Sequence, residues 1–171
     1  MGSLPRHRYG SAVVTLKNIG TYVIGGGHGA AYKTIDFLAS GSQQWVAGPD
    51  IPVNIVYGCS VVISQRSFLA MYGRNIREYQ VDLSNRTSTA GWQDASKWPQ
   101  LQISHGSMPG CSKVGERVVV AGYSGKTEIL DLAKRTIEYA GDLNTPRRYF
   151  HIISITTLIT HSRPITNLLL F

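Results

Sequence analysis

The sequence predicts an all-β protein in which a unit of about 47 residues is repeated three times. Four prolines follow one another at intervals of 47 residues: Pro5, Pro52, Pro99 and Pro146. An aromatic residue keeps the same interval, seven positions before the next proline: Trp45, Trp92 and Tyr139. Each unit also contains short β-branched and aromatic runs separated by turn residues. A period near 50 is typical of stacked supersecondary units that cannot bury their apolar faces alone.

The first unit, residues 5–51, predicts a meander of four antiparallel strands. Its first two runs are separated by Lys17-Asn18-Ile19-Gly20, and its last two by Ser40-Gly41-Ser42, both of which are typical turn sequences. The expected strands are Ser11–Leu16, Thr21–Ile24, Lys33–Leu38 and Gln43–Ala47. No stretch has a convincing helical periodicity.

The second and third units, residues 52–98 and 99–145, repeat this order with variations. In the second unit the last strand is expected after a longer turn at Ser84–Thr89. The strands expected there are Cys59–Ile63, Phe68–Tyr72, Arg77–Leu83 and Ala90–Gln93. In the third unit Pro109 and Gly110 stand at the first strand, where we expect them to break the ladder or confine it to a bulge. Its second strand, Arg117–Ala121, is the clearest β run of the chain.

A fourth unit begins at residue 146 and does not continue. Residues 146–155 contain its opening strand, Arg147–Ile155. In the first unit the second strand ends at the pair Gly25-Gly26, but Thr166 and Asn167 stand at the place where the fourth unit should have such a pair. We therefore divide the chain into repeats over residues 1–155 and a non-repeat tail over residues 156–171. The tail is rich in apolar residues but is interrupted by charged residues and proline, so we do not interpret it as a membrane span.

These repeats resemble the kelch family of β-propellers. In the first unit the doublet Gly25-Gly26 closes the second strand, Trp45 lies in the fourth, and Pro52 begins the next unit. The frame recurs in the later units with a single glycine each: Gly73 with Trp92, then Gly122 with Tyr139. The resemblance covers about Leu4 to Ile155 and implies radial four-stranded blades, here three of them plus the opening strand of a fourth.

A kelch-type ring of this kind needs more blades than this chain has. Propellers close with about four to eight blades, so the resemblance implies a fragment of a longer propeller. Closure by association of several copies is the second interpretation. In either case the flank of the last blade would be open, and we expect the isolated chain to be marginally stable and to associate.

The composition fits a soluble β domain without a metal or cofactor. The 171 residues are 43% hydrophobic and 16% charged, with a net charge of +7. No apolar stretch follows Met1 as in a secretory signal, so a cytoplasmic location is expected. Cys59 and Cys111 are interpreted as small core residues rather than a disulfide scaffold. The five histidines are scattered singly and lack metal-ligand spacing.

Two further motifs are interpreted structurally. Gly25–Gly29 could form a phosphate cradle, but such loops precede a helix, and a β run is expected here. We interpret its glycines as permitting close packing and a turn. Asn85-Arg86-Thr87 matches a glycosylation sequon, and we interpret it as a turn because no secretion signal is present.

Basic residues are expected to gather at one end of the blades. In a meander, the loop that enters the first strand and the loop that leaves the second lie at the same end of the sheet. Arginines and lysines there outnumber the acids Glu78 and Glu128, and tyrosines interleave with them. The basic residues expected at this end are Arg6, Arg8, Lys33, Arg74, Arg77, Lys126, Arg147 and Arg148, and the tyrosines are Tyr9, Tyr32, Tyr57, Tyr123 and Tyr149.

These observations predict a protein-interaction module, not an enzyme, whose partner presents an acidic peptide or loop. Arginine grips carboxylates with two hydrogen bonds, and tyrosine adds rigid contact area. The candidate ligand-binding residues are Arg6, Arg8, Tyr9, Tyr32, Tyr57, Arg74, Asn75, Arg77, His105 and Arg147. The alternative is that these charges are ordinary solvated loop residues.

The kelch resemblance adds possible contexts for this activity. It suggests substrate adaptors of cullin-type ubiquitin ligases, some of which use an arginine-asparagine turn like Gly73-Arg74-Asn75. Actin or cytoskeletal binding is an alternative, and a copper radical oxidase is another that we set aside because no histidine pair stands beside Tyr57 and Cys59. The chain has no motif that reads DNA or RNA, so no nucleic-acid partner is expected.

Overall fold

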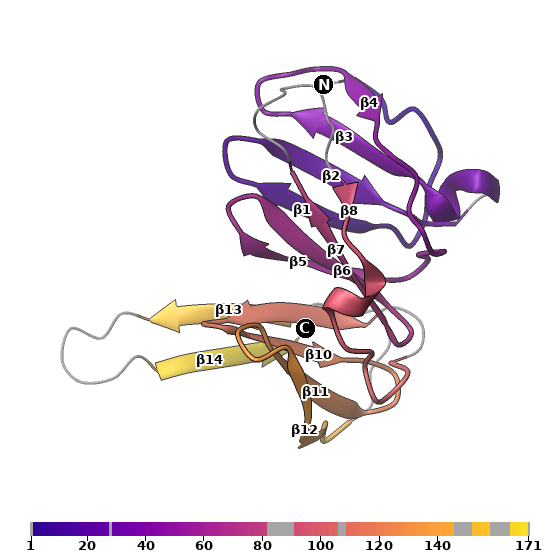
Figure 1. The fold of residues 1–171 in the computed structure, drawn as a ribbon. Helices are drawn as coiled ribbons and strands as arrows, with labels where there is room; N and C mark the ends of the chain where they lie inside the picture. The colour runs from indigo at the N-terminus through magenta and orange to yellow at the C-terminus, as the bar shows by residue number, and fades with distance from the viewer. Residues whose placement is uncertain are drawn as a thin grey trace.

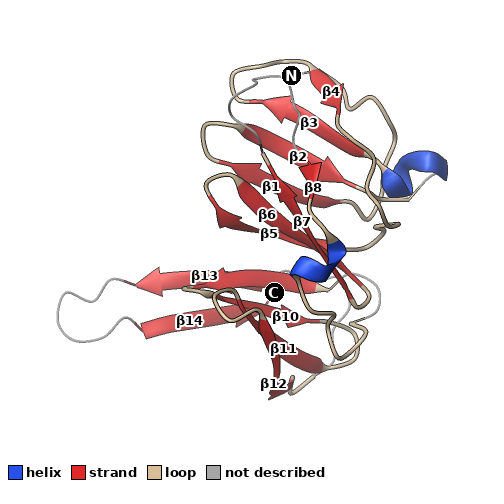
Figure 2. Ribbon diagram, in the orientation of Figure 1, coloured by secondary structure: helices blue, strands red, loops and turns tan. Residues whose placement is uncertain are grey.

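The computed structural model describes residues 2–27, 29–81, 91–105, 109–145, 152–157 and 165–170. Three four-stranded antiparallel sheets and one two-stranded sheet make up most of it (Figures 1 and 2). Helix is limited, within these residues, to two short 3-10 turns, η1 (Gly29–Lys33) and η2 (Ala95–Lys97). The prediction of an all-β chain with three four-stranded units is therefore confirmed.

The first sheet is a meander of four consecutive strands. They are β1 (Ala12–Leu16), β2 (Gly20–Ile24), β3 (Ile35–Ala39) and β4 (Trp45–Ala47). The third strand begins two residues later than expected, because Lys33 belongs to η1. Gly20 adopts a φ of 149°, and a Cβ there would lie 2.2 Å from the carbonyl oxygen of Leu38. Only glycine therefore fits between the first turn and the neighbouring strand.

The second sheet has the same topology. Its strands are β5 (Cys59–Ser64), β6 (Ser67–Tyr72), β7 (Asn75–Gln80) and β8 (Gly91–Trp92). The third strand was expected to begin at Arg77 and begins two residues earlier. The reason is that Tyr72 pairs with Asn75, which leaves a turn of only Gly73 and Arg74. The expected turn at Ser84–Thr89 lies outside the described residues.

The third sheet corrects one sequence-based expectation. Its strands are β9 (Gly110–Val114), β10 (Arg117–Ala121), β11 (Lys126–Asp131) and β12 (Thr136–Asp142). The ladder of β9 with β10 is unbroken from Gly110 to Val114, so the expected disruption of the first strand is wrong. Pro109 lies immediately before the strand, where its missing N–H costs no ladder hydrogen bond. β10 has the predicted bounds.

The first strands of successive sheets lie side by side. β1 neighbours β5 (Figure 1), β5 neighbours β9, and β9 neighbours β13 (Ile152–Thr157). The Ser60 hydroxyl donates to the Val13 carbonyl across the first junction (3.0 Å), and Lys113 Nζ donates to the Ile63 carbonyl across the second (3.2 Å). Four-stranded sheets joined through their first strands are consistent with part of a β-propeller.

The last described strands extend this order and revise the expectation for the tail. β13 pairs antiparallel with β14 (Ile165–Leu170), from Ile152 opposite Leu170 to Thr157 opposite Ile165. β13 occupies part of the predicted opening strand, whereas residues 146–151 lie outside the described residues. The segment assigned to a non-repeat tail therefore supplies a strand that pairs as the second strand of a fourth sheet would.

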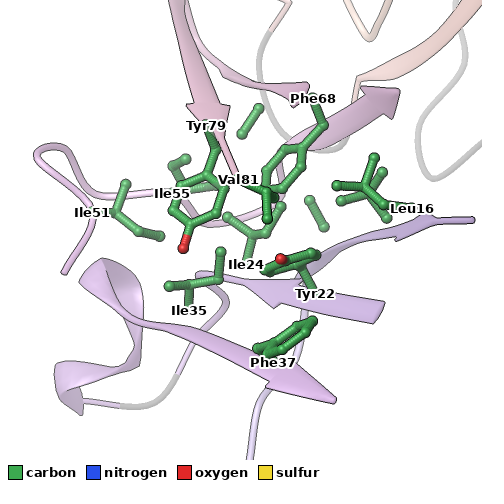
Figure 3. Close-up of a cluster of buried hydrophobic side chains, with 13 residues drawn as sticks. Leu16, Tyr22, Ile24, Ile35, Phe37, Ile51, Ile55, Phe68, Tyr79 and Val81 are labelled. Carbon is green, nitrogen blue, oxygen red and sulfur yellow. The ribbon is translucent and has the colours of Figure 1, made fainter. Parts of the chain in front are cut away.

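The apolar cores lie between the sheets rather than within one of them. Between the first and second sheets, Tyr22 stacks on Phe37 with ring centroids 4.6 Å apart, and Phe68 stacks on Tyr79 at 5.1 Å (Figure 3). A second cluster joins the second sheet to the third. It includes Leu69, Met71, Ile76, Trp98, Val118 and Leu130. Burial of apolar area between successive sheets is thus what holds this fold together.

Cys59 and Cys111 form a disulfide between β5 and β9. The expectation that both are simply small core residues is therefore wrong. The two cysteines lie 52 residues apart in sequence, but the side-by-side first strands bring their Cα atoms within 5.9 Å. A sequence alone does not reveal this proximity, because it depends on how neighbouring sheets pack. The bond joins two sheets that share no ladder hydrogen bonds in the described residues.

Candidate functional site

The connections between sheets and the turns between second and third strands lie at the same end of the molecule, which we call the connector end. Backbone hydrogen bonds join them: Ile51 donates to Lys33 (2.6 Å) and Leu101 donates to Arg74 (3.0 Å). Tyr123 likewise donates to the carbonyl of His105 (3.2 Å). The topological expectation that these segments share one end is therefore correct. Residues from different repeats can act together there.

A pocket of about 500 Å³ opens where the first sheet leads into the second. The connection from β4 to β5 forms one wall, and the outer strands of the second sheet with the start of the next connection form the other. The lining residues are Pro49, Asp50, Pro52, Val53, Arg77, Trp92, Gln93, Asp94 and Ala95. Its size is in the range of ligand pockets, and its lining combines apolar groups with a few polar ones.

Arg77 is the cation of this pocket. Its side chain is half-buried, and Nη1 donates to the carbonyl of Ile76 (2.8 Å). Its Nε has no hydrogen-bond partner in the part of the chain that is described, and no described carboxylate forms an ion pair with it. A buried N–H without an acceptor costs free energy. Because the guanidinium is half-buried and has no described carboxylate partner, an ion pair formed here would be screened by salt less than one on a solvated arginine.

Trp92 forms the aromatic side of the same pocket. Its ring packs edge to face on Tyr79, with centroids 5.0 Å apart, which fixes its orientation. The indole Nε1 is buried and has no hydrogen-bond partner among the described residues. From the sequence, Trp92 is expected only as a structural residue of the repeat. Its position opposite Tyr79 on β7 places it beside Arg77 in the pocket lining as well.

Two carboxylates also line the pocket, and the sequence analysis did not include them. Asp50 lies in the first connection, and Asp94 caps η2, where its side chain accepts from the Ser96 N–H (2.7 Å). This hydrogen bond lowers the pKa of Asp94. The prolines on both sides of Asp50 in Pro49-Asp50-Ile51-Pro52 are the signal that could have pointed to a rigid, exposed acidic loop at this place.

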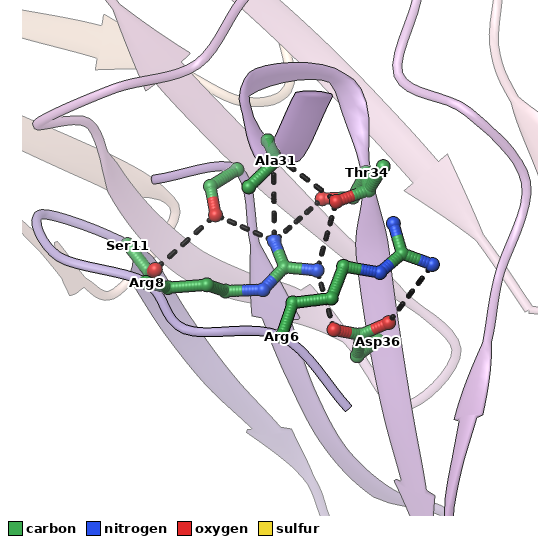
Figure 4. Close-up of polar contacts among 7 residues, drawn as sticks. Arg6, Arg8, Ser11, Ala31, Thr34 and Asp36 are labelled. Atoms are coloured by element: carbon green, nitrogen blue, oxygen red, sulfur yellow. Dashed lines mark hydrogen bonds and ion pairs between the residues drawn. The ribbon is translucent and has the colours of Figure 1, made fainter. Parts of the chain in front are cut away.

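Arg8 does not belong to an exposed basic surface. Its side chain is 1% exposed and pairs with the fully buried Asp36 on β3 (Figure 4). It also donates to the carbonyls of Gly25 (2.6 Å) and Thr34 (3.1 Å). The expectation that Arg8 contacts a ligand at the surface is corrected, because its donors hold the N-terminal segment on the first sheet. Arg6 lies beside it, 35% exposed and 3.7 Å from Asp36.

His105 is likewise part of the interior. Its side chain is fully buried, and its Nε2 lies 2.8 Å from Glu128 Oε2 on β11. The same carboxylate accepts from the backbone N–H groups of Gln102 (2.8 Å) and Ile103 (3.2 Å). The candidate ligand role of His105 is therefore replaced by a structural one. Its Nδ1 is buried without a partner among the described residues.

The second sheet buries a carboxylate in the same manner. Glu78 on β7 accepts from the Trp98 indole (2.8 Å) and pairs with Lys97 Nζ (2.7 Å). Together with Asp36 and Glu128, it gives each of the three four-stranded sheets a buried acid on its third strand. Each of these acids is hydrogen-bonded by residues of the segment that precedes a sheet or connects two sheets. The two acids counted against the basic end are thus both buried and partnered. Asp50, Asp94 and Asp142 are the acids exposed near this end, so its positive charge is smaller than expected.

The remaining candidate residues differ in exposure. Arg74 is exposed, and its Nε donates to the Leu101 carbonyl (2.8 Å), so it also ties the second sheet to the next connection. Asn75 is half-buried at the start of β7, and Tyr32 is half-buried within η1. Tyr9 and Tyr57 contact each other, with ring centroids 5.7 Å apart. Arg147 lies outside the described residues, as do Arg148 and Tyr149.

Tyr57 has a backbone conformation that is uncommon for its type. Its φ is 57°, and its N–H donates to the Gly10 carbonyl (2.7 Å). A Cβ on Gly10 would lie 2.3 Å from the Tyr57 ring, so the glycine makes room for it. Left-handed backbone at a bulky residue is strained and is found often at functional sites. Tyr57 therefore stays a candidate contact residue at the connector end.

Lys126 forms a surface cluster with β12 rather than a free cation. Its Nζ lies 3.2 Å from Asp142, and the Tyr139 hydroxyl donates to the same carboxylate oxygen (2.6 Å). These hydrogen bonds lower the pKa of Asp142, and the contact with Asp142 raises the pKa of Lys126. Tyr139 is 48% exposed, unlike its repeat equivalent Trp92. The unpaired cations of this end, within the described residues, are therefore Lys33, Arg74 and Arg77.

The described residues hold no cluster of three or more metal-ligating side chains, and none of their helices has the length and apolarity needed to cross a bilayer. The sulfur of Cys59 is bonded to Cys111 and so is not free to join Tyr57, as the radical oxidase alternative would need. No known family model matches the sequence, and no curated protein matches it significantly.

Proposed function

We propose that this chain is part of a kelch-type β-propeller that acts as a protein-interaction module. The 47-residue spacing of proline and aromatic residues supports the kelch assignment, together with the four-stranded meanders joined through their first strands. The connector end binds a segment of a partner protein that carries carboxylates. Tyr9 and Tyr57 offer aromatic contact area at this end, and Lys33, Arg74 and Arg77 supply the charge.

The observation that carries this proposal is the environment of Arg77. It lines a pocket of ligand size, it has no carboxylate partner among the described residues, and its Nε lacks an acceptor. Arg8, by contrast, has its carboxylate partner in Asp36. An acidic group of a partner would supply the missing charge, with a hydrogen bond to a charged donor worth about 1.5–3 kcal/mol.

The disulfide between β5 and β9 bears on the compartment in which this module works. A cytoplasmic location was expected from the sequence. The Cys59–Cys111 bond argues against it, because disulfides persist mainly in oxidising compartments. We therefore propose the activity without a compartment, and the adaptor context suggested by the kelch resemblance stays a prediction.

The test uses a fluorescein-labelled octapeptide that alternates leucine and glutamate, and its glutamine counterpart, with binding followed by fluorescence anisotropy. We expect the glutamate peptide to bind with an affinity that falls as salt rises. Arg77→Gln should weaken binding about tenfold or more. Lys134→Gln is the matched control, because Lys134 is exposed on the β11–β12 turn at the opposite end. Equal effects of the two substitutions, or equal binding of the two peptides, would contradict the proposal.

A further inference from the structure

We propose that the pocket beside Arg77 binds a single carboxylate flanked by an apolar group, and that it disfavours runs of acidic residues. This inference rests on the proposed function, which requires only that carboxylates bind at the connector end. The inference adds which residues the bound peptide segment contains: one acidic residue next to an apolar one. The carriers of the inference are Arg77, the apolar lining of the pocket, and the two aspartates Asp50 and Asp94.

The need for one carboxylate follows from the donors. Arg77 is the single arginine or lysine among the described residues that line the pocket. Its charge has no described carboxylate partner, and Arg77 Nε and Trp92 Nε1 are N–H groups without acceptors in the described chain. A carboxylate has two oxygens that accept hydrogen bonds in one plane and matches an arginine well. The pocket thus offers one positive charge, on a guanidinium without a described carboxylate partner, for an anion.

The apolar flank follows from the rest of the lining. Pro49, Pro52 and Val53 contribute aliphatic surface, and Trp92 contributes an indole held in place by Tyr79. At about 500 Å³ the pocket is much larger than a carboxylate alone would fill. Ligand pockets gain most of their binding free energy from apolar contact, while polar groups fix orientation. A ligand with a large aliphatic or aromatic side chain beside its carboxylate would contact both the apolar lining and the Arg77 guanidinium.

The exclusion of acidic runs follows from Asp50 and Asp94. Both line the pocket, and the hydrogen bond from Ser96 keeps Asp94 ionised. One bound carboxylate is offset by Arg77. Each further negative charge would meet Asp50 and Asp94, and the described lining residues hold no second cation to offset it. Like charges brought together at an interface cost several kcal/mol and are a common source of specificity. A phosphate with two negative charges should be disfavoured for the same reason.

The experiment follows the Trp92 indole N–H by two-dimensional NMR of the whole chain while capped tetrapeptides are added. The probes are acetyl-Gly-Leu-Glu-Gly-amide, its glutamine analogue, its phosphoserine analogue and acetylated tetraglutamate amide. We expect the leucine-glutamate peptide to shift the Trp92 resonance and to bind about tenfold more tightly than the glutamine analogue. The Trp98 indole, already bonded to Glu78, is the internal control and should not shift.

Variants separate the two parts of the inference. Arg77→Gln should abolish the preference for glutamate over glutamine. The Asp50→Asn/Asp94→Asn double variant keeps the side-chain size and the acceptor for Ser96, and should raise the affinity for tetraglutamate about tenfold. The remaining indole resonances report whether each variant keeps the fold.

Each result decides between the alternatives. If tetraglutamate or the phosphopeptide binds the unaltered protein more tightly than the leucine-glutamate peptide, the inference is wrong while binding of acidic ligands stands. If the acidic peptides bind without shifting the Trp92 resonance, the pocket is not their binding site and the inference is wrong, whereas the proposed binding at the connector end stands. If no acidic peptide binds, both the inference and the proposed function fail.

Discussion

Arg8 and Asp36 form an ion pair in which the side chains are 1% and 0% exposed. Arg8 precedes the first strand and Asp36 lies in the third, so the pair fastens the N-terminal segment to β3 (Figure 4). Thr34 adds an acceptor through its hydroxyl, 2.8 Å from the Arg8 guanidinium. The pair is buried enough that loss of Asp36 leaves the charge of Arg8 without a carboxylate partner.

Removing one partner of this pair should destabilise the chain strongly. We expect Asp36→Ala to lower the free energy of unfolding by about 3–5 kcal/mol, because Arg8 stays buried without its anion. The measurement is urea unfolding followed by circular dichroism. The Arg8→Met/Asp36→Leu double variant is the control and should recover much of the loss, since apolar residues of similar size often replace a buried pair well. A loss below about 1 kcal/mol for Asp36→Ala, as is typical of surface pairs, would contradict this view.

Reduction of the Cys59–Cys111 disulfide should loosen the junction of the second and third sheets. The cysteines are 52 residues apart, and closing a loop of that length in the unfolded chain corresponds to about 4 kcal/mol of stabilisation. We expect the urea midpoint to fall when dithiothreitol is added. The Cys59→Ser/Cys111→Ser double variant should unfold at the lower midpoint with or without reductant. Identical midpoints for oxidised and reduced protein would show that the bond contributes nothing.

The aromatic cluster between the first two sheets should make the fold sensitive to alkali. Burial raises the pKa of Tyr22 to about 12 from an ordinary value of 10.0. Burial and the nearby Tyr22 also raise the pKa of Tyr79. The folded state therefore favours the neutral phenol, and this contribution is complete below pH 10 and is lost as pH rises toward 12. Urea unfolding across this range should show stability falling with pH, and less steeply in Tyr22→Phe.

The side of the first sheet that faces away from the second should promote association. Val13 is 58% exposed on this side, whereas Ala12 and Val14, which point the other way, are buried. We expect the chain to self-associate in sedimentation experiments, and Val13→Thr to weaken the association because it removes exposed apolar surface. A compact monomer that melts cooperatively would contradict the expectation of marginal stability and association drawn from the sequence.

The elements that the sequence predicted well are those set by local pattern. β10 has its expected bounds because Arg117–Ala121 is a β-branched run closed by turns on both sides. The start of β7 was misplaced by two residues, because a two-residue turn at Gly73 and Arg74 is shorter than a sequence pattern reveals. Pro109 misled the prediction for the third sheet, since its effect depends on whether it stands inside or just before the strand.

The candidate site was only partly predictable. Topology correctly placed Arg74 and Arg77 at one end, because the alternation of strand direction follows from the chain order. The burial of Arg8 and His105 was missed, since each depends on a carboxylate from another part of the sheet, Asp36 or Glu128. Chain spacing does not show such partners. That Arg77 has no carboxylate partner among the described residues could be recognised only once the surrounding residues had positions.

The three buried carboxylates make the sheets non-interchangeable. Asp36 is matched by a guanidinium, Glu78 by an ammonium and an indole, and Glu128 by an imidazole and two backbone amides. Repeats with nearly equal spacing are prone to pair with the wrong neighbour during folding. A sheet that docked against the wrong connecting segment would bury an acid without its donors, at a cost of several kcal/mol. The order of the sheets is therefore encoded in their charges, although their backbones are nearly alike.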